Sequence, residues 1–214
     1  MKLVVIGVHL RREDIEPMAE AIDAGGLWLS ALAVPNDQPI GDRELLLRVA
    51  AKRAELLDRA TFLAVRYGFT ATSAEDARAK CLPRLERWRQ ALESAANRVE
   101  MTLKVAAQNP QPRPERSAFD SGAAYLRALH ESTRAAAVEP AFRDAADGAI
   151  APLAARHRWI ARDNASLELV ALVEREAIER VNAAGNDLKQ KFPAIPFLLS
   201  GPWPLEVFAD DDHE

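Results

Sequence analysis

Histidine and cysteine are the side chains of this chain that most often bind metals or act as nucleophiles. The four histidines lie far apart, and none has a second ligand at the spacing of one helix or strand face. They are His9, His130, His157 and His213. The single cysteine, Cys81, falls on the apolar side of a helical pattern, which favours a buried and unreactive thiol. We therefore predict no metal site and no thiol nucleophile.

Other kinds of chemistry need patterns that the sequence lacks. Its glycines do not form a phosphate-binding loop, and no serine has the flanking glycines of a nucleophile elbow. The segment Arg156-His157-Arg158-Trp159 has the residues to grip a phosphate, but arginines beside a helix end are more often surface charges. The strand aromatics Trp28, Phe62 and Tyr67 do not form an RNA-stacking platform. We predict no catalytic residue, no bound cofactor and no enzyme.

Composition and charge restrict the partners of the chain. Its 214 residues are 49% hydrophobic, which is enough for a substantial core. The net charge of −4 argues against a nucleic-acid partner held by bulk electrostatics. No segment approaches the roughly 20 apolar residues of a membrane span, and the start of the chain reads as a strand and not as a secretory signal. A single cysteine excludes an intrachain disulfide, so we expect a soluble cytoplasmic protein.

The clearest structural elements lie between residues 61 and 105. Residues 61–67 are β-branched and aromatic and end at a glycine, which predicts a strand. Ser73 stands at the N-cap of a following helix, and Pro83 should interrupt that helix. Residues 99–105 then alternate between apolar and polar, which predicts a second strand. The order of these elements predicts a parallel β-α-β unit.

The preceding residues continue the same alternation. We predict strands at 3–10 and 27–34, a helix at 11–24, and a helix that begins at Asp42. The predicted inward face of that second helix carries Leu46, Val49, Ala50, Leu57 and Ala60. The first half is therefore expected to be a ferredoxin-like α/β sandwich with helices covering its sheet.

The second half begins after a proline-rich segment, residues 109–116, which favours an extended connector. Residues 117–147 and 174–191 are predicted helices, a short helix surrounds Leu153, and 167–173 and 195–199 are predicted strands. We therefore predict an α/β (α+β) protein of two helix-covered sheet domains, the second helix-rich with a small sheet. The domains are 1–108 and 117–208, joined by 109–116 and followed by an acidic tail, 209–214.

Five segments together resemble the gas vesicle protein F/L family (GvpF/GvpL), in the order in which that family has them. They are Ala64-Val65-Arg66-Tyr67-Gly68, Val99–Val105, Ser121–Leu126, Leu172-Val173-Glu174-Arg175 and Gly201-Pro202-Trp203-Pro204. Ala64 stands where the family usually has proline, so the chain is similar to a divergent member.

The resemblance implies a non-enzymatic accessory protein for gas vesicle formation, without cofactor, cytoplasmic and associated with gas vesicles. Its implied partners are the hydrophobic shell protein (GvpA) and other accessory gas vesicle proteins, bound during nucleation and assembly. A shell subunit exposes apolar surface before it assembles, and a groove on a soluble protein would shield that surface. The alternative is a small-molecule-binding regulatory module with ferredoxin-like domains.

Three residues of the matching segments are candidates for contact with a partner. They are Arg66, Tyr67 and Trp203. For Trp203 we favour a structural interpretation, in which the indole packs over a sheet edge or a seam between domains, because tryptophan is highly buried on average. The alternative is that the prolines of its segment present the indole to a partner.

Overall fold

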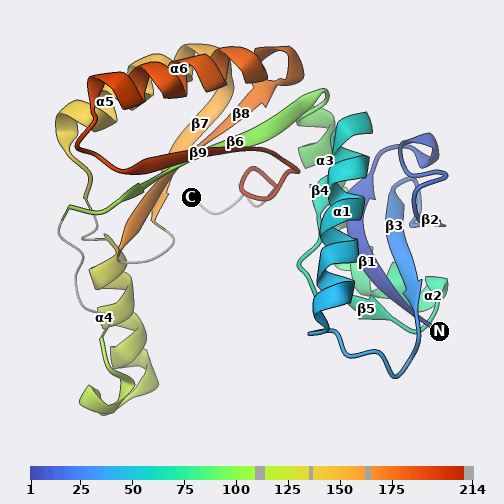
Figure 1. The fold of residues 1–214 in the computed structure, drawn as a ribbon. Helices are drawn as coiled ribbons and strands as arrows, with labels where there is room; N and C mark the ends of the chain where they lie inside the picture. The colour runs from blue at the N-terminus through green and yellow to red at the C-terminus, as the bar shows by residue number, and fades with distance from the viewer. Residues whose placement is uncertain (109–113, 135–136, 162–164, 210–214) are drawn as a thin grey trace. The chain divides into compact units, whose positions relative to one another are not determined.

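The computed structural model describes residues 1–108, 114–134, 137–161 and 165–209 (Figure 1). These residues form two compact units, each containing one sheet with helices packed against it. The first unit comprises Met1–Val99 and Trp203–Glu214, and the second unit comprises Glu100–Pro202. The predicted mixed α/β class is confirmed.

The division between the units lies earlier in the chain than the proline-rich segment 109–116. That segment falls within the second unit, and its residues 109–113 lie outside the described residues. Residues 203–209 also return to the first unit. The backbone N–H of Leu205 donates to the carbonyl of Phe62 (2.9 Å), and the N–H of Ala64 donates to the carbonyl of Leu205 (3.0 Å).

The sheet of the first unit is built around its first strand. β1 pairs antiparallel with β3 on one side and with the short β4 and β5 on the other, and β2 pairs antiparallel with β3. Every residue of β1 from Leu3 onward is buried, as expected for a central strand. The strands are β1 (Lys2–His9), β2 (Glu20–Asp23), β3 (Trp28–Val34), β4 (Leu63–Ala64) and β5 (Thr70–Ala71).

Helix α1 (Arg43–Arg59) begins where the sequence predicts, after the N-cap Asp42. Its inward face differs from the prediction. Leu45 and Val49 pack against β1 and β3, whereas Leu46 and Ala50, both predicted to face inward, are exposed. Apolar residues occupy so many consecutive positions of this helix that periodicity alone does not determine which stripe meets the sheet.

The helix predicted at residues 11–24 is wrong. The segment forms a single turn of 3-10 helix, η1 (Arg12–Asp14), and then the strand β2. Pro17 is the physical reason, because proline lacks the N–H that a helix interior requires and its ring crowds the preceding turn. The apolar residues that suggested a helix also fit a buried turn, in which Ile15 is fully buried.

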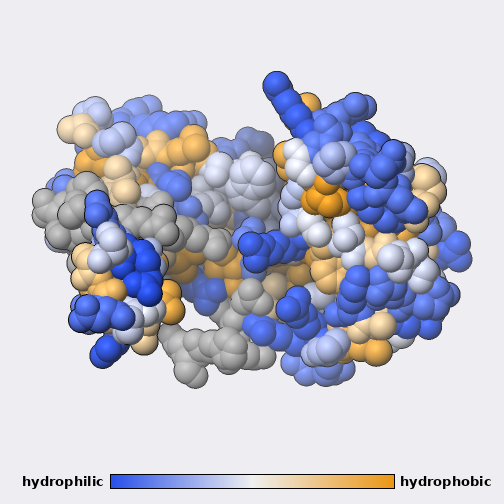
Figure 2. Space-filling view, turned by 90° about the horizontal axis from the view of Figure 1, so that it is seen from below, coloured by the Kyte–Doolittle hydropathy of each residue, from blue (hydrophilic) through white to orange (hydrophobic). Residues whose placement is uncertain are grey.

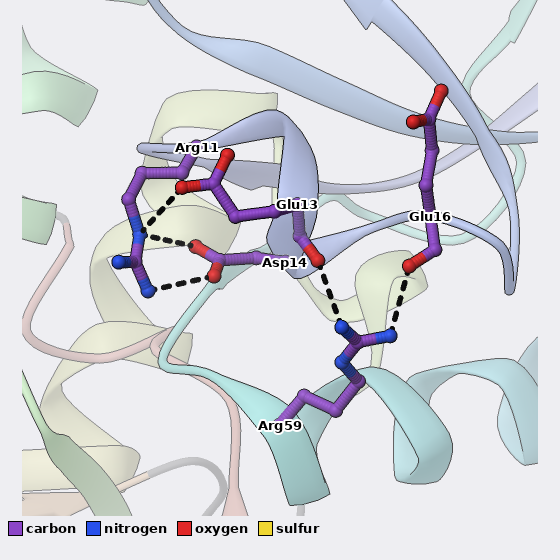
Figure 3. A network of polar contacts seen from close by, with 5 residues as sticks. All are labelled: Arg11, Glu13, Asp14, Glu16 and Arg59. Atoms are coloured by element: carbon purple, nitrogen blue, oxygen red, sulfur yellow. Dashed lines mark hydrogen bonds and ion pairs between the residues drawn. The ribbon is translucent and has the colours of Figure 1, made fainter.

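Polar contacts stabilise this turn, which lacks the continuous hydrogen bonds of a helix (Figure 3). Arg59, at the end of α1, donates to the backbone carbonyls of Glu13 (3.0 Å) and Glu16 (2.8 Å). Arg11 forms an ion pair with Asp14 at 2.9 Å. The turn is therefore fixed to the end of α1, which is distant from it in the sequence.

Residues 74–94 form two α-helices with a proline turn between them, as predicted. α2 (Ala74–Cys81) and α3 (Leu85–Ser94) flank the 3-10 turn η2 (Leu82–Arg84), which contains Pro83. The hydroxyl of Ser73 accepts from the N–H of Asp76 (3.2 Å), and the Asp76 carboxylate accepts from the N–H of Thr72 (2.9 Å). Both contacts satisfy N–H groups near the helix start.

The Ser73→Ala substitution is expected to destabilise the first unit by about 1 kcal/mol, because it removes the cap of α2. Urea unfolding measures the change. Ser94→Ala is the control, since Ser94 is exposed at the end of α3 and its hydroxyl bonds, among the described residues, only to the Ala91 carbonyl; we expect an effect within about 0.5 kcal/mol. Equal effects of the two substitutions would contradict a capping role.

The predicted parallel β-α-β unit of residues 61–105 is not formed. Its first strand shrinks to β4, which pairs antiparallel with β1, and its second strand, β6 (Arg98–Ala106), belongs to the other sheet. The alternation of β6 is confirmed, since Val99, Met101, Leu103 and Val105 are all buried. Local periodicity predicted the strand, but the sheet that it joins depends on contacts far away in the sequence.

The second unit has a four-stranded sheet in the order β7-β8-β6-β9. The strands other than β6 are β7 (Ala154–Ala161), β8 (Ser166–Glu174) and β9 (Phe197–Trp203), and β7 pairs antiparallel with β8. The helices are α4 (Gly122–Arg134), α5 (Pro140–Ile150) and α6 (Ile178–Lys191), with the short turns η3 (Arg116–Ala118), η4 (Ala151–Leu153) and η5 (Arg175–Ala177). α5 and α6 lie beside each other (Figure 1).

Along the chain of this unit, the four strands and the helices α5 and α6 follow one another as β6-α5-β7-β8-α6-β9. This is the β-α-β-β-α-β order of ferredoxin-like folds, here in the second unit. The order of the first unit differs, so the ferredoxin-like detail predicted for the first half is not confirmed there. β7 was not predicted as a strand. Residues 156–159, which were expected beside a helix end, lie within β7.

Candidate functional site

A pocket of about 610 Å³ opens in the first unit, a size typical of small-molecule sites. Four segments that are distant in sequence line it. They are Arg53 of α1; Leu63–Tyr67 and Phe69 around β4; Arg84 of η2 with Arg87 and Trp88 of α3; and Glu206 and Ala209. The pocket therefore exists only when the chain is folded.

The wall around β4 is fixed to the central strand of the sheet. The N–H of Val65 donates to the carbonyl of Ile6 (3.1 Å), and the N–H of Val5 donates to the carbonyl of Phe69 (3.0 Å). Gly68 supplies the turn between them with a φ of 94°, a conformation that side chains other than glycine rarely adopt. The pocket wall is thus held in one conformation by the backbone of β1.

Arg53 connects α1 to this wall. Its guanidinium donates to the carbonyl of Val65 and more weakly to that of Ile6 (3.5 Å). Its Nε is buried and has no hydrogen-bond partner among the described residues. Burial lowers the pKa of Arg53, and the carboxylate of Glu206 acts in the opposite direction. Arg53 therefore holds a partly desolvated positive charge at the pocket wall.

The charge of the pocket is opposite in sign to that of the chain. Four arginines and one glutamate line it, whereas the chain as a whole carries a net charge of −4. The side chains of Arg66 and Arg84 have no hydrogen bond or ion pair with any described residue. The pocket is therefore a locally basic site with two arginines that have no partner within the described chain.

Cys81 lies close to this site in sequence but has no reactive character. The side chain is fully buried, and burial raises the pKa of the thiol to about 11, with Arg84 acting in the opposite direction. The thiol is therefore protonated at neutral pH, and a protonated thiol is a poor nucleophile. The prediction of a buried cysteine is confirmed.

A second surface feature lies on α1, the helix that supplies Arg53. Its outer face, Leu46, Leu47, Ala50, Ala51 and Ala54, is apolar and exposed. Leu46 is 42% exposed and Leu47 is 61% exposed. Positions 47, 51 and 54 follow the helical repeat, so these side chains form one strip along the helix. We call it the α1 strip.

Comparison with known proteins relates this fold to a family. The sequence profile described as gas vesicle synthesis protein GvpL/GvpF matches residues 18–209, which is most of the chain. The chain belongs to this family. A GvpL/GvpF protein has a role in gas vesicle formation, which is therefore the role of this chain.

Two solved structures share the fold of this GvpL/GvpF protein. The crystal structure of GvpF from an Anabaena species is 13% identical in sequence, with a TM-score of 0.65 and a match over 99% of each chain. That of GvpF from Microcystis aeruginosa is 12% identical, with a TM-score of 0.68, over 98% of this chain and 99% of that one. A search of curated proteins finds no match.

The segments that resembled the family occupy both units of this GvpL/GvpF protein. Residues 64–68 form part of the pocket wall, and 99–105 lie in β6. Residues 121–126 begin α4, 172–175 end β8, and 201–204 include the end of β9. The predicted family is confirmed, and one of its matching segments coincides with the candidate site.

The structure separates the three predicted partner-contact residues. Arg66 and Tyr67 both line the pocket, whereas Trp203 does not. The hydroxyl of Tyr67 donates to the carbonyl of Ile40, so this side chain also anchors the wall. Trp203 is 49% exposed, so about half of its surface is covered and half is open to solvent. As the last residue of the edge strand β9, it has a neighbouring strand on one side only.

Sequence reasoning missed most of the site in this GvpL/GvpF protein. The sequence patterns singled out none of Arg53, Arg84, Arg87 and Glu206, yet all four line the pocket. The four residues come from three segments far apart in the sequence, around residues 53, 84–87 and 206, so no single motif contains them. Only the resemblance at residues 64–68 pointed to this part of the chain.

The described residues offer little support for other kinds of site. Among them, no group of three or more histidine, cysteine, aspartate or glutamate side chains is placed to hold a metal ion. None of their helices is both long and apolar enough to cross a membrane. His9 is buried beside Ser30, at 3.0 Å from its hydroxyl, in the core of the first unit.

Proposed function

We propose that this GvpL/GvpF protein is an assembly factor that binds the hydrophobic shell protein, GvpA, through the α1 strip. In this role it shields apolar surface of the shell protein during nucleation and assembly and also contacts other accessory gas vesicle proteins. It acts by binding in the cytoplasm, in association with gas vesicles, without a cofactor and without catalysing a reaction.

The observation that carries this proposal is the exposure of the α1 strip. A helix packed on a sheet needs one apolar stripe, and α1 has that stripe in Leu45, Val49 and Leu56. The α1 strip is a further apolar surface that the fold of the first unit does not use. Figure 2 shows one face of the molecule, on which exposed hydrophobic residues lie among hydrophilic ones in both units. Apolar strips with polar surroundings are typical of helix-binding surfaces.

The predicted contact residues supplement the α1 strip. The guanidinium of Arg66 has no partner among the described residues, and a carboxylate of a partner protein would pair with it. Tyr67 holds the loop that presents Arg66. Trp203 offers a half-exposed indole of the type that contributes strongly to interfaces. We assign these three residues to the contact with gas vesicle proteins.

The Leu47→Ala substitution is expected to weaken binding to purified shell protein about tenfold, because burying a leucine contributes roughly 1.5–3 kcal/mol. The folded protein should keep its stability, since Leu47 is exposed in the free chain. Equilibrium binding to detergent-solubilised or peptide forms of the shell protein measures the change, and gas vesicle yield after gene replacement measures its consequence.

Three other leucines provide matched controls. Leu82, Leu126 and Leu198 are 60%, 62% and 61% exposed, which is close to Leu47, but they lie on η2, α4 and β9. Alanine at each of them should leave binding of the shell protein unchanged. If Leu47→Ala behaves like the three controls, the α1 strip is not the binding surface. If the unaltered protein does not bind the shell protein at all, the proposed function is wrong.

A further inference from the structure

The basic pocket of the first unit is not explained by binding to a hydrophobic partner. It gathers four arginines in an acidic chain, and Glu206 is the only carboxylate that lines it among the described residues. The side chains of Arg66 and Arg84 have no partner among the described residues, and neither has the buried Nε of Arg53. Arg66 and Arg84 are exposed at the pocket, whereas Arg53 is partly buried, and a partly buried cation is normally paired with an anion. The pocket thus has the properties of an anion site.

We propose that this pocket binds a small organic phosphate, with its phosphate groups on Arg53, Arg66 and Arg84 and its organic part against Phe69 and Trp88. Guanidinium groups bind phosphate oxygens through paired, charge-assisted hydrogen bonds. The ligand class follows from this preference together with the shape of the site.

The size and lining of the pocket distinguish an organic phosphate from a bare ion. A volume of about 610 Å³ is much larger than a phosphate group requires and lies within the range of small-molecule sites. Its lining also includes apolar and aromatic residues: Leu63, Val65, Tyr67, Phe69 and Trp88. An anion with an attached planar or apolar group would contact both parts of this lining, whereas an inorganic ion would contact only the arginines.

The arginines are also partly positioned before any ligand arrives. Arg53 is fixed by its hydrogen bonds to Val65 and Ile6, and Arg66 lies on a loop held to β1. Arg84 lies in η2, between two helices whose inner faces are buried. Binding therefore requires little ordering of the backbone, which reduces its entropic cost.

Calorimetric titration of the full chain tests the proposal with defined probes. We expect AMP, ATP and pyrophosphate to bind, with AMP binding more tightly than inorganic phosphate because of its organic part. Adenosine, which lacks phosphate, and citrate, which carries carboxylates only, should bind at least about tenfold more weakly than ATP. Equal binding of citrate and ATP would overturn the proposal in favour of a general acidic partner, such as a protein segment.

Arginine variants locate the binding. Arg66→Gln and Arg84→Gln should each weaken ATP binding at least about tenfold, because each removes a charged hydrogen-bond donor. Arg48→Gln is the matched control, since Arg48 is exposed on α1 and does not line the pocket. Circular dichroism should show an unchanged fold for all three variants. Unchanged ATP binding in Arg66→Gln and Arg84→Gln would overturn the proposal.

Residues 210–214, of which four are acidic, follow the pocket residue Ala209 directly in sequence. Their charge would compete with an anionic ligand, so the titrations are repeated on the full chain carrying Asp210→Asn, Asp211→Asn and Asp212→Asn. If no phosphate probe binds either the unaltered protein or the variant with the three substitutions, the proposal is overturned. Arg66 is assigned to both contacts, so the two proposals are separated at other residues. Leu47→Ala should leave ATP binding unchanged, and Arg84→Gln should leave shell-protein binding unchanged, so either proposal can fail without the other.

Discussion

Replacing Phe142 with alanine is expected to destabilise the second unit by about 3–5 kcal/mol, the largest effect predicted for a single substitution in this protein. Phe142 is fully buried on the inner face of α5, one turn before Ala146. Its ring lies 5.3 Å from that of Phe192 and 5.2 Å from that of Phe197, measured between centroids. The substitution removes these contacts and leaves a cavity between α5, the end of α6 and β9.

Hydrogen–deuterium exchange followed by peptide mapping is the measurement, because it reports the two units separately. Peptides from the second unit should lose protection in Phe142→Ala, while peptides of β1 and β3 should not. Phe119→Ala is the control in the same unit, since Phe119 is only partly buried and contacts Tyr125 edge-on at 6.0 Å. A loss of protection in Phe142→Ala no greater than that in Phe119→Ala would show that α5 is not packed as described.

Acid is expected to destabilise the first unit in a pH range where the carboxylates contribute little. His9 is fully buried, with its Nε2 3.0 Å from the hydroxyl of Ser30 and its ring stacked on Phe62 at 5.0 Å. Burial lowers its pKa from 6.5 to about 3. In the unfolded chain His9 takes up a proton as the pH falls below about 6.5, whereas the folded state does not.

The sign follows from that difference in bound protons. The unfolded state binds more protons, so the contribution of neutral His9 is fully present above about pH 6.5 and is lost as the pH falls toward about 3. Between pH 6.5 and about pH 4 the free energy of unfolding should decrease by about 3 kcal/mol from this residue alone. The surface aspartates with lowered pKa values, such as Asp23 and Asp76, act mainly below about pH 4.

His9→Gln isolates this effect. Glutamine does not titrate, and its amide retains the capacity to bond to the hydroxyl of Ser30. Urea unfolding at pH 7 and at about pH 4 should show a decrease in stability for the unaltered protein that is about 3 kcal/mol larger than the decrease for His9→Gln. Equal decreases in the two proteins would mean that His9 becomes protonated without unfolding.

Local signals in the sequence predicted individual elements well. Ser73 and Asp42 begin helices as expected, because an N-cap depends only on residues within one turn. The alternation of β6 and the apolar residues of β1 gave those strands for the same local reason. The helix predicted at 11–24 is wrong because its apolar spacing outweighed Pro17, a local signal that was present in the sequence.

The family was also available from the sequence, since five short segments in the right order resembled GvpF/GvpL. The resemblance gave a role in gas vesicle formation and drew attention to Arg66 and Tyr67. The resemblance did not predict which surfaces of the protein contact a partner, because a motif does not state which of its residues are exposed. Trp203 shows this: its type favours burial, and its place at the end of an edge strand leaves it half exposed.

The sequence by itself determined where most helices and strands begin, which residue types form the cores, and the family of this protein. Only the tertiary structure decided which stripe of α1 faces the sheet, and hence that Leu46 and Leu47 are exposed. It alone brought Arg53, Arg66 and Arg84 to one pocket. The physical reason is the range of the interactions: caps and periodicity act within a few residues, whereas a pocket is formed by segments that meet only when distant strands pair.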